Sequence, residues 1–276
     1  MKKLLSVILV VAMIFSLAAC GSQEVEEKGT LMMATTTSTA DTGLLDYLAP
    51  IFKEDTGWEL NWTAVGTGEA LKMGENGDVD VVLVHAKASE EEFVNNGYGV
   101  KRVPVMYNDF VVVGPEAEDT YGDDISACFK AIQDKKLTFV SRGDDSGTDK
   151  KERGIWKTLG IDTSLNPNYL ESGQGMGATI TMADEKQAYC LTDRGTWLKF
   201  KNDAELEIEL NIVCQGDSNL LNQYGVIAVN PEKYADTNID GANEFIEWLC
   251  SEKVQKLIGE YGVDTYGQAL FTPNAE

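Results

Sequence analysis

Three short segments of the sequence are polar and rich in small residues, a composition suited to binding a small anion. They are residues 35–39 (TTTST), 65–68 (VGTG) and 141–148 (SRGDDSGT). Ser and Thr hydroxyls donate hydrogen bonds, and glycine lets backbone N–H groups come close to a ligand. Arg142 adds a planar fork of donors and the only full positive charge in these segments. Such residues can enclose an ionised oxyanion without any covalent step.

The same residue types have an ordinary structural use, because Ser, Thr and Asp are the usual N-caps of helices. For one such segment, capping and ligand binding are equally good interpretations. Three segments in one chain, one of them with Arg142, favour a site. We expect Asp144 or Asp145 to hold the Arg142 guanidinium and Asp149 to cap the following helix. Residues 173–179 (GQGMGAT) are a fourth candidate segment, but they lack the lysine of a P-loop.

The sequence offers little for hydrolytic or metal chemistry. His85 is the only histidine, and no GxSxG or HExxH motif is present. Most Cys/His zinc sites are thereby excluded, and a hydrolase would depend on His85, which has no nucleophile near it in the sequence. We therefore predict no catalytic residue, no cofactor and no resident metal. His85 itself is interpreted either as a satisfied histidine at a strand end or as a residue that lines the cleft.

The acidity of the chain excludes one class of partner. It has 23 Lys and Arg residues against 45 Asp and Glu residues, so its formal net charge is −22. Nucleic acid is bound through clustered Lys and Arg, and none is expected to bind here.

The elements around these segments alternate between strand-like and helix-like patterns. Each segment is predicted to lie between a strand and the helix that follows it. In an open α/β sheet such loops meet at the carboxyl ends of the strands, where ligands bind. Strands are predicted at 31–34, 58–65, 79–84, 137–140 and 188–191, and helices at 40–56, 69–73, 89–95, 125–135, 149–159, 178–187 and 242–258.

Two long extended stretches, 103–113 and 224–229, are predicted to cross between two lobes. This is the arrangement of type II periplasmic binding proteins, an α/β fold in which each lobe is an open mixed sheet flanked by helices. The ligand lies in the interlobe cleft, and the lobes close about a hinge. The predicted first lobe is 30–107 plus 227–276, and the second is 108–226. The hinge segments are predicted near 105–114 and 220–229.

The N-terminus has the pattern of an exported lipoprotein. Residues 1–19 join a basic start to an apolar run too short for a membrane span, which is typical of a signal peptide. The residues Leu-Ala-Ala-Cys ending at Cys20 resemble the bacterial lipobox, so Cys20 is the predicted lipid attachment site and 20–29 a polar tether. We predict a lipid-anchored protein on the extracytoplasmic face of the cell membrane. Whether Cys128, Cys190, Cys214 and Cys250 pair is left open.

Several segments together resemble the substrate-binding protein of tungstate ABC importers, from about residue 30 to the C-terminus. They are TTTS (35–38), GTGEAL (66–71), DVVLVHA (80–86), SRGDDSGT (141–148) and NQYGVIAVNP (222–231). The resemblance implies a monomeric receptor that captures tungstate, or molybdate, by hydrogen bonds and delivers it to a membrane permease. The oxyanion-binding residues that it implies are Thr37, Ser38, Thr67, Arg142, Ser146, Gly147 and Thr148.

The closest alternative is a phosphate- or sulfate-binding receptor of the same fold. Phosphate receptors resemble this chain at Arg142–Thr148, but they place an acidic residue at the end of the strand where His85 stands here. That acidic group accepts the proton of HPO4(2−). Tungstate carries no proton at neutral pH, so His85 in place of an acid favours tungstate.

Overall fold

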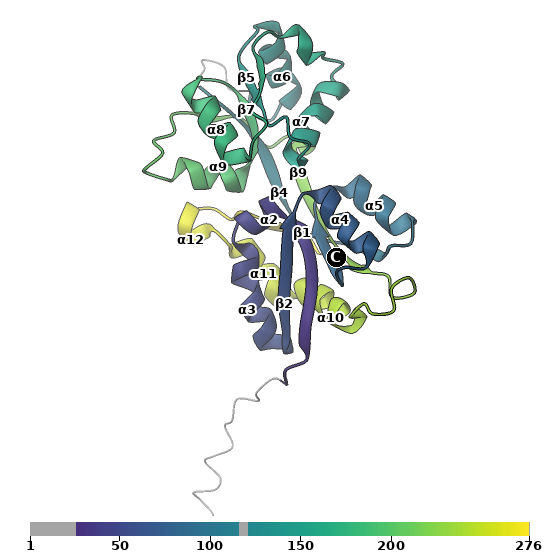
Figure 1. Ribbon diagram of the computed structural model, residues 1–276. Coiled ribbons are helices and arrows are strands. Elements are labelled where there is room, and N and C mark those ends of the chain that lie inside the picture. Colours follow the sequence, from purple (N-terminus) through teal and green to yellow (C-terminus); the bar gives the residue numbers. More distant parts are fainter. Residues whose placement is uncertain (1–25, 116–120, 276) are drawn as a thin grey trace, which may run out of the picture.

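The computed structural model describes residues 26–115 and 121–275. Cys20 and the expected signal peptide lie outside these residues. Two lobes lie one above the other and are joined by two long strands, β4 (Gly99–Gly114) and β9 (Leu221–Val229) (Figure 1). Within the described part of the chain, no helix has the length and apolar character needed to cross a membrane.

The first lobe is built on a mixed sheet with the strand order β10-β4-β9-β3-β1-β2. β1 is parallel to β2 and β3, whereas β9 is antiparallel to β3 and β4. β3 is buried along its whole length, as expected for an apolar strand covered on both faces. The other strands of this lobe are β1 (Gly29–Thr36), β2 (Trp58–Val65), β3 (Val81–Val84) and β10 (Thr272–Pro273).

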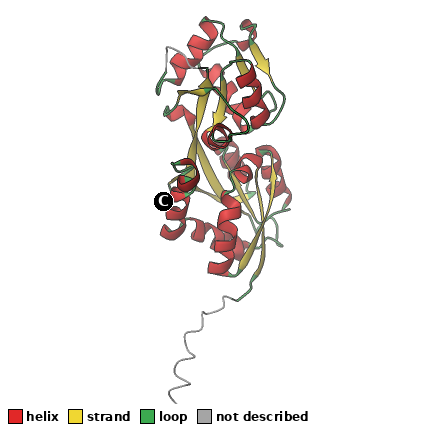
Figure 2. Cartoon of the chain, turned by 90° about the vertical axis from the view of Figure 1, so that its left-hand side faces the viewer, coloured by secondary structure: helices red, strands yellow, loops and turns green. Residues whose placement is uncertain are grey.

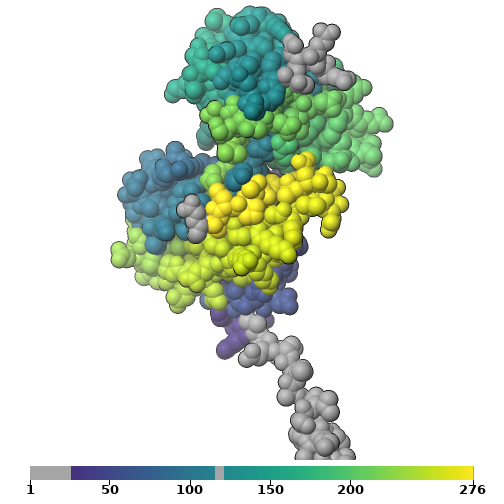
Figure 3. All heavy atoms as spheres, turned by 180° about the vertical axis from the view of Figure 1, so that it is seen from behind, coloured from purple at the N-terminus to yellow at the C-terminus, as the bar shows by residue number. Residues whose placement is uncertain are grey.

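Helices cover both faces of this sheet (Figure 2). α4 and α5 pack on one face through Leu71 and Phe93, and α3, α10 and α11 pack on the other through residues such as Phe52 and Phe245. Seen from behind, the C-terminal residues lie over the back of this lobe (Figure 3, yellow). The helices are α2 (Thr37–Asp41), α3 (Leu44–Thr56), α4 (Thr67–Asn76), α5 (Lys87–Asn95), α10 (Ile239–Leu249), α11 (Glu252–Glu260) and α12 (Val263–Tyr266).

The second lobe continues from the end of β4. There β4 pairs with β7 and β8, and β5 and β6 form a short parallel pair. α6 and α7 enclose an aromatic core in which the rings of Phe129 and Trp156 are 4.1 Å apart. The elements are α6 (Ile125–Asp134), β5 (Phe139–Ser141), α7 (Gly147–Thr158), β6 (Tyr169–Glu171), α8 (Met176–Glu185), β7 (Cys190–Asp193), α9 (Arg194–Lys201) and β8 (Asn211–Cys214), with short 3-10 helices at Thr163–Leu165 and Ser218–Leu220.

One strand is shared by both lobes. β4 pairs with β9 as far as Asp109, which lies opposite Leu221. The next residue, Phe110, lies opposite Asp193 of β7. β4 therefore changes partners between two consecutive residues. The predicted hinge segment 105–114 lies within β4, and the segment 220–229 coincides with β9 except for its first residue, Leu220.

Two expected helices were wrong, because each is interrupted. The stretch 40–56 breaks at Gly43, whose φ of 77° is left-handed and ends α2 before α3 begins. The stretch 242–258 breaks at Ser251, whose side chain accepts a hydrogen bond from the Val254 N–H and starts α11 as a new helix. The four described cysteines are free thiols: Cys128, Cys190, Cys214 and Cys250.

Candidate oxyanion-binding site

Each predicted loop does follow a strand and lead into a helix. Residues 35–39 connect β1 to α2, 65–68 connect β2 to α4, and 141–148 connect β5 to α7. Two of the loops also cap their helices: Thr36 accepts a hydrogen bond from the Thr39 N–H, and Ser146 accepts one from the Asp149 N–H. The capping interpretation is therefore correct at these two positions.

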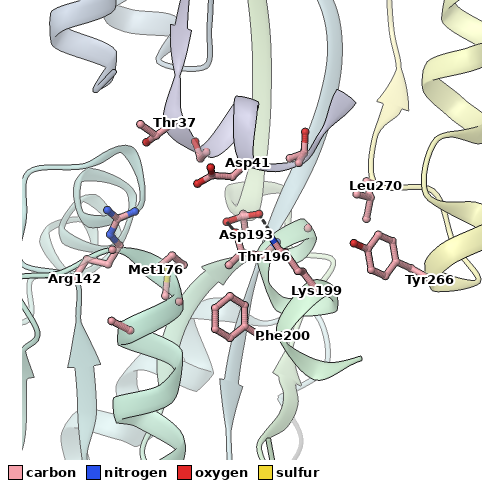
Figure 4. A pocket seen from close by; sticks show the side chains of 16 residues that line it. Thr37, Asp41, Arg142, Met176, Asp193, Thr196, Lys199, Phe200, Tyr266 and Leu270 are labelled. Carbon is pink, nitrogen blue, oxygen red and sulfur yellow. Dashed lines mark hydrogen bonds between the residues drawn. The ribbon is translucent and has the colours of Figure 1, made fainter. Parts of the chain in front are cut away.

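A cavity of about 460 Å³ lies between the lobes, and we call it the first cavity. Thr37 and Ser38 line it from the first lobe, and Arg142 lines it from the second (Figure 4). The N-termini of α8 and α9 also open onto it through Gly175 and Gly195. α8 has no side-chain cap, so its first N–H groups add positive potential to the cavity.

The Arg142 guanidinium is held in place but not saturated. Its Nη2 donates to Asp144 Oδ2 over 2.5 Å, which confirms that one of the two neighbouring acids orients it. The Arg142 backbone oxygen accepts from the Gly173 N–H over 2.8 Å. Burial raises the pKa of Asp144, but bonds from Ser146 and the charge of Arg142 outweigh this and leave it below its usual value. Arg142 Nε is buried and has no hydrogen-bond partner among the described residues.

Asp149 does not cap α7 as expected. Ser146 is the N-cap, and the Asp149 carboxylate instead reaches back across the loop. Its Oδ1 accepts from the Gly143 N–H and its Oδ2 from the Asp145 N–H, both over 3.2 Å. A capping residue would accept hydrogen bonds only from N–H groups of its own helix. Asp149 instead accepts them from the loop backbone next to Arg142 and so fixes that loop.

Several residues of the first cavity were missed by the sequence reasoning. Asp193 ends β7 and accepts bonds from the Thr196 N–H and hydroxyl over 2.8 and 2.7 Å, and burial raises its pKa. Asp41 also lines the cavity. The first cavity is therefore lined by two acidic side chains that the sequence reasoning did not name, and both Asp193 oxygens accept bonds from Thr196. The sequence Asp-Arg-Gly-Thr at 193–196 was the missed signal, since it repeats the strand-end pattern of the other loops.

A second cavity, of about 480 Å³, lies between Thr67, Gly147 and His85. Lys150 and Lys151 of α7 also line it. Gly147 approaches His85 closely, because a Cβ there would stand 3.1 Å from His85 Cε1. The predicted residues are thus divided: Thr37, Ser38 and Arg142 line the first cavity, Thr67 and Gly147 line the second, and Ser146 and Thr148 line neither.

His85 lines the second cavity and contacts Ser38, which lines the first. Its Nε2 is 3.0 Å from Thr36 Oγ1 and 3.1 Å from Ser38 Oγ, and its Nδ1 is 3.1 Å from Asn222 Oδ1. Burial lowers the pKa of His85 to about 4, so the ring is neutral at pH 7. Both interpretations of His85 hold. Its two ring nitrogens have hydrogen-bond partners at the end of β3, and its side chain lines the second cavity.

The site contains donors but no metal-ligating cluster. Within residues 26–115 and 121–275, no group of three or more His, Cys, Asp or Glu side chains is placed to hold a metal ion. The neutral donors come from Thr37, Ser38 and the helix N-termini, and the positive charge comes from Arg142 and the exposed Lys199. The first cavity is therefore suited to an anion of a few oxygen atoms.

Comparison with known proteins finds a matching family and close sequence relatives. The sequence matches the PBP superfamily domain over residues 22–253. The tungstate-binding protein TupA of Peptoclostridium acidaminophilum is 51% identical, in an alignment that covers 100% of this chain and 99% of the relative. The protein of the same name from Campylobacter jejuni is 45% identical over 81% of this chain and 84% of its own length.

Solved structures show the same similarity. The tungstate-binding protein TupA from Desulfovibrio alaskensis G20 superimposes with a TM-score of 0.83 at 49% identity, covering 90% of this chain and 100% of that structure. A structure described as the tungstate ABC transporter from Geobacter sulfurreducens has a TM-score of 0.75 at 46% identity, covering 86% of this chain and 100% of its own.

Proposed function

The chain belongs to the PBP superfamily and, within it, to the family of TupA tungstate-binding proteins, and on this premise we propose that it is the extracytoplasmic tungstate receptor of an ABC importer. It binds the oxyanion reversibly in the interlobe cleft, catalyses no reaction and needs no cofactor. It passes the anion to a membrane permease and works as a monomer. The names of the relatives and the donor-rich cleft support this assignment.

Arg142 is the main support for an anion in the first cavity. A buried guanidinium nitrogen without a partner costs free energy, because its hydration is lost and nothing replaces it. Arg142 Nε is in this position, and Thr37 and Ser38 line the same cavity from the other lobe. An oxyanion between them would accept from the guanidinium and from both hydroxyls at once, and would draw the lobes together.

The remaining predicted residues complete the proposed site at the N-terminus of α7. Gly147 contacts His85, and His85 contacts Ser38, so this N-terminus lies only one side chain away from the first cavity. We propose that Thr67, Ser146, Gly147 and Thr148 contribute donors there when the anion is bound. A hydrogen bond to a charged group contributes roughly 1.5–3 kcal/mol, so about six bonds readily give micromolar affinity or better after the costs of closure.

Titration calorimetry of the purified protein tests the function. Tungstate is expected to bind at least tenfold more tightly than phosphate at pH 7, because HPO4(2−) carries a proton, and His85 stands where phosphate receptors place the acid that accepts it. An unpaired buried donor costs about 1–3 kcal/mol. Sulfate has no proton, but its shorter bonds cannot reach every donor at once. Phosphate binding as tight as tungstate binding would replace the tungstate assignment with a phosphate receptor. Molybdate, titrated in parallel, measures the preference between the two metal oxyanions.

We further propose that the protein is anchored to the membrane through a lipid on Cys20. The lipobox-like sequence supports this, and the first described residues leave the lobe at the pole opposite the second lobe (Figure 1). Cells that express Cys20→Ala are expected to incorporate no labelled fatty acid into the protein, while Cys250→Ala, the matched control, incorporates it normally. Labelling of Cys20→Ala equal to wild type would contradict the anchor.

A further inference from the structure

A chain of hydrogen bonds leads from the oxyanion loop to the crossover of the lobes. Ser38 and Thr36 contact His85 Nε2. His85 Nδ1 contacts Asn222 Oδ1 of β9, and Asn222 Nδ2 donates to Asn108 Oδ1 of β4 over 2.8 Å. The chain connects a loop that lines the first cavity to both strands that join the lobes.

The direction of the bonds follows from the asparagines. The Asn222 amide nitrogen donates to Asn108, so its oxygen faces His85 and must accept. His85 Nδ1 therefore carries the proton of the neutral ring, and Nε2 is an acceptor. That nitrogen has one lone pair, but the hydroxyls of Thr36 and Ser38 are both within 3.1 Å of it. Only one hydroxyl can make a full bond at a time, so Ser38 can release His85 to Thr36 and turn its proton to a ligand.

The far end of the chain lies at the point where β4 changes lobes. Asn108 and Asn222 are opposite each other in the β4–β9 ladder. Two residues further on, β4 has left β9, and Phe110 pairs with β7. Both asparagine side chains are buried, at 5% and 6% exposure. Buried amides cost free energy unless they are bonded, and apolar residues would pack here without that cost.

We propose that His85, Asn222 and Asn108 are positioning residues that couple the Ser38 hydroxyl, and hence occupancy of the oxyanion site, to the crossover of β4 between the lobes. We call the three residues the relay. The proposal rests on the proposed function, because the ligand is the oxyanion in the first cavity. Bending at the crossover moves Asn108 relative to Asn222. The hydrogen bond from Asn222 to His85 passes this movement to the His85 ring, whose contact with Ser38 must break before the Ser38 hydroxyl can donate to the ligand. Binding and closure then favour each other reciprocally.

A double-mutant cycle on tungstate affinity tests the relay. Ser38→Ala is expected to weaken binding about tenfold and Asn222→Leu about fivefold, and independent effects would multiply to about fiftyfold in the double variant. The relay predicts only about tenfold for the double variant, because Asn222 acts only by placing the ring from which Ser38 turns to the ligand, and without the Ser38 hydroxyl its loss has no further effect. No hydrogen bond joins Ser38 to Asn222 directly in the described part of the chain. Asn166, buried in the second lobe, supplies the control: Asn166→Leu and Ser38→Ala must combine independently.

A pair of His85 variants keeps the test decisive if Asn222→Leu does not fold. His85→Asn places an amide donor near the position of Nδ1, towards Asn222, but is too short to reach the hydroxyls. His85→Gln places an amide acceptor near the position of Nε2 but has no donor at the position of Nδ1. The relay predicts that each weakens tungstate binding about fivefold. Independent effects in the cycle, or a loss confined to one His85 variant or absent from both, would overturn the relay and leave the tungstate receptor intact. Wild-type protein that binds no tungstate would instead refute the proposed function, and the relay with it.

Discussion

Arg142→Ala is expected to weaken tungstate binding by about ten- to a hundredfold in calorimetric titration. Arg142 supplies the positive charge of the predicted loops, and its Nε is buried without a partner in the described structure. Losing a hydrogen bond between charged groups costs roughly 1.5–3 kcal/mol, which corresponds to this range. The long-range field of the acidic chain matters little, because physiological salt screens charges over about 8 Å.

Two further variants separate the local role of Arg142 from its charge. Lys256→Ala removes a positive charge from an exposed position on α11 and is expected to leave the dissociation constant unchanged. Arg142→Lys keeps the charge but loses the planar fork, so it should restore only part of the affinity. An Arg142→Ala protein with wild-type affinity would exclude Arg142 from the site.

The largest expected loss of stability comes from Gly225→Ala, at about 3–5 kcal/mol. Gly225 lies in β9, and a Cβ there would collide with Glu90 Oε2 and approach Arg102 Nε to 2.9 Å. Glu90 is fully buried and pairs with Arg102 over 2.6 Å. The added methyl group would push the carboxylate away, and a buried charge would be left without its partner.

Thermal unfolding followed by circular dichroism measures this effect. The melting temperature of Gly225→Ala is expected to fall by about 10 °C, since 1 kcal/mol shifts a chain of this size by roughly 2–4 °C. Gly154→Ala is the control, because a Cβ at that helical position meets no atom within 4 Å and alanine favours helix by up to about 1 kcal/mol. A Gly225→Ala protein that melts within 2 °C of wild type would show that the pair can rearrange without cost.

The positions of the predicted loops between strands and helices could be read from the sequence because they depend on local chemistry. A strand, a polar segment of small residues and a helix follow one another at 35–39 and at 141–148, and the structure has this order in both places. Even the orientation of Arg142 by Asp144 involves residues only two positions apart.

The features that could not be predicted from the sequence depend on contacts between distant segments. His85 is bonded to Ser38 and Asn222, 47 and 137 residues away, and no local pattern indicates either bond. The division of the predicted residues between two cavities likewise depends on a long-range approach, that of Gly147 at the start of α7 to His85. Ser251 was missed for a different reason: the apolar spacing continues through it, and a single N-cap outweighs that periodicity.

The continuity of β4 makes the two lobes one thermodynamic unit. A domain with its own sheet can unfold alone. Here β4 pairs with β9 in the first lobe and with β7 in the second, so the unfolding of either lobe breaks hydrogen bonds of a strand that both lobes share. Amide protons in the middle of β4 should then exchange with solvent only when the entire chain opens, and heat should unfold the protein in a single calorimetric step. An anion bound in the cleft would slow that exchange at the middle of β4, because it lowers the population of the globally unfolded chain.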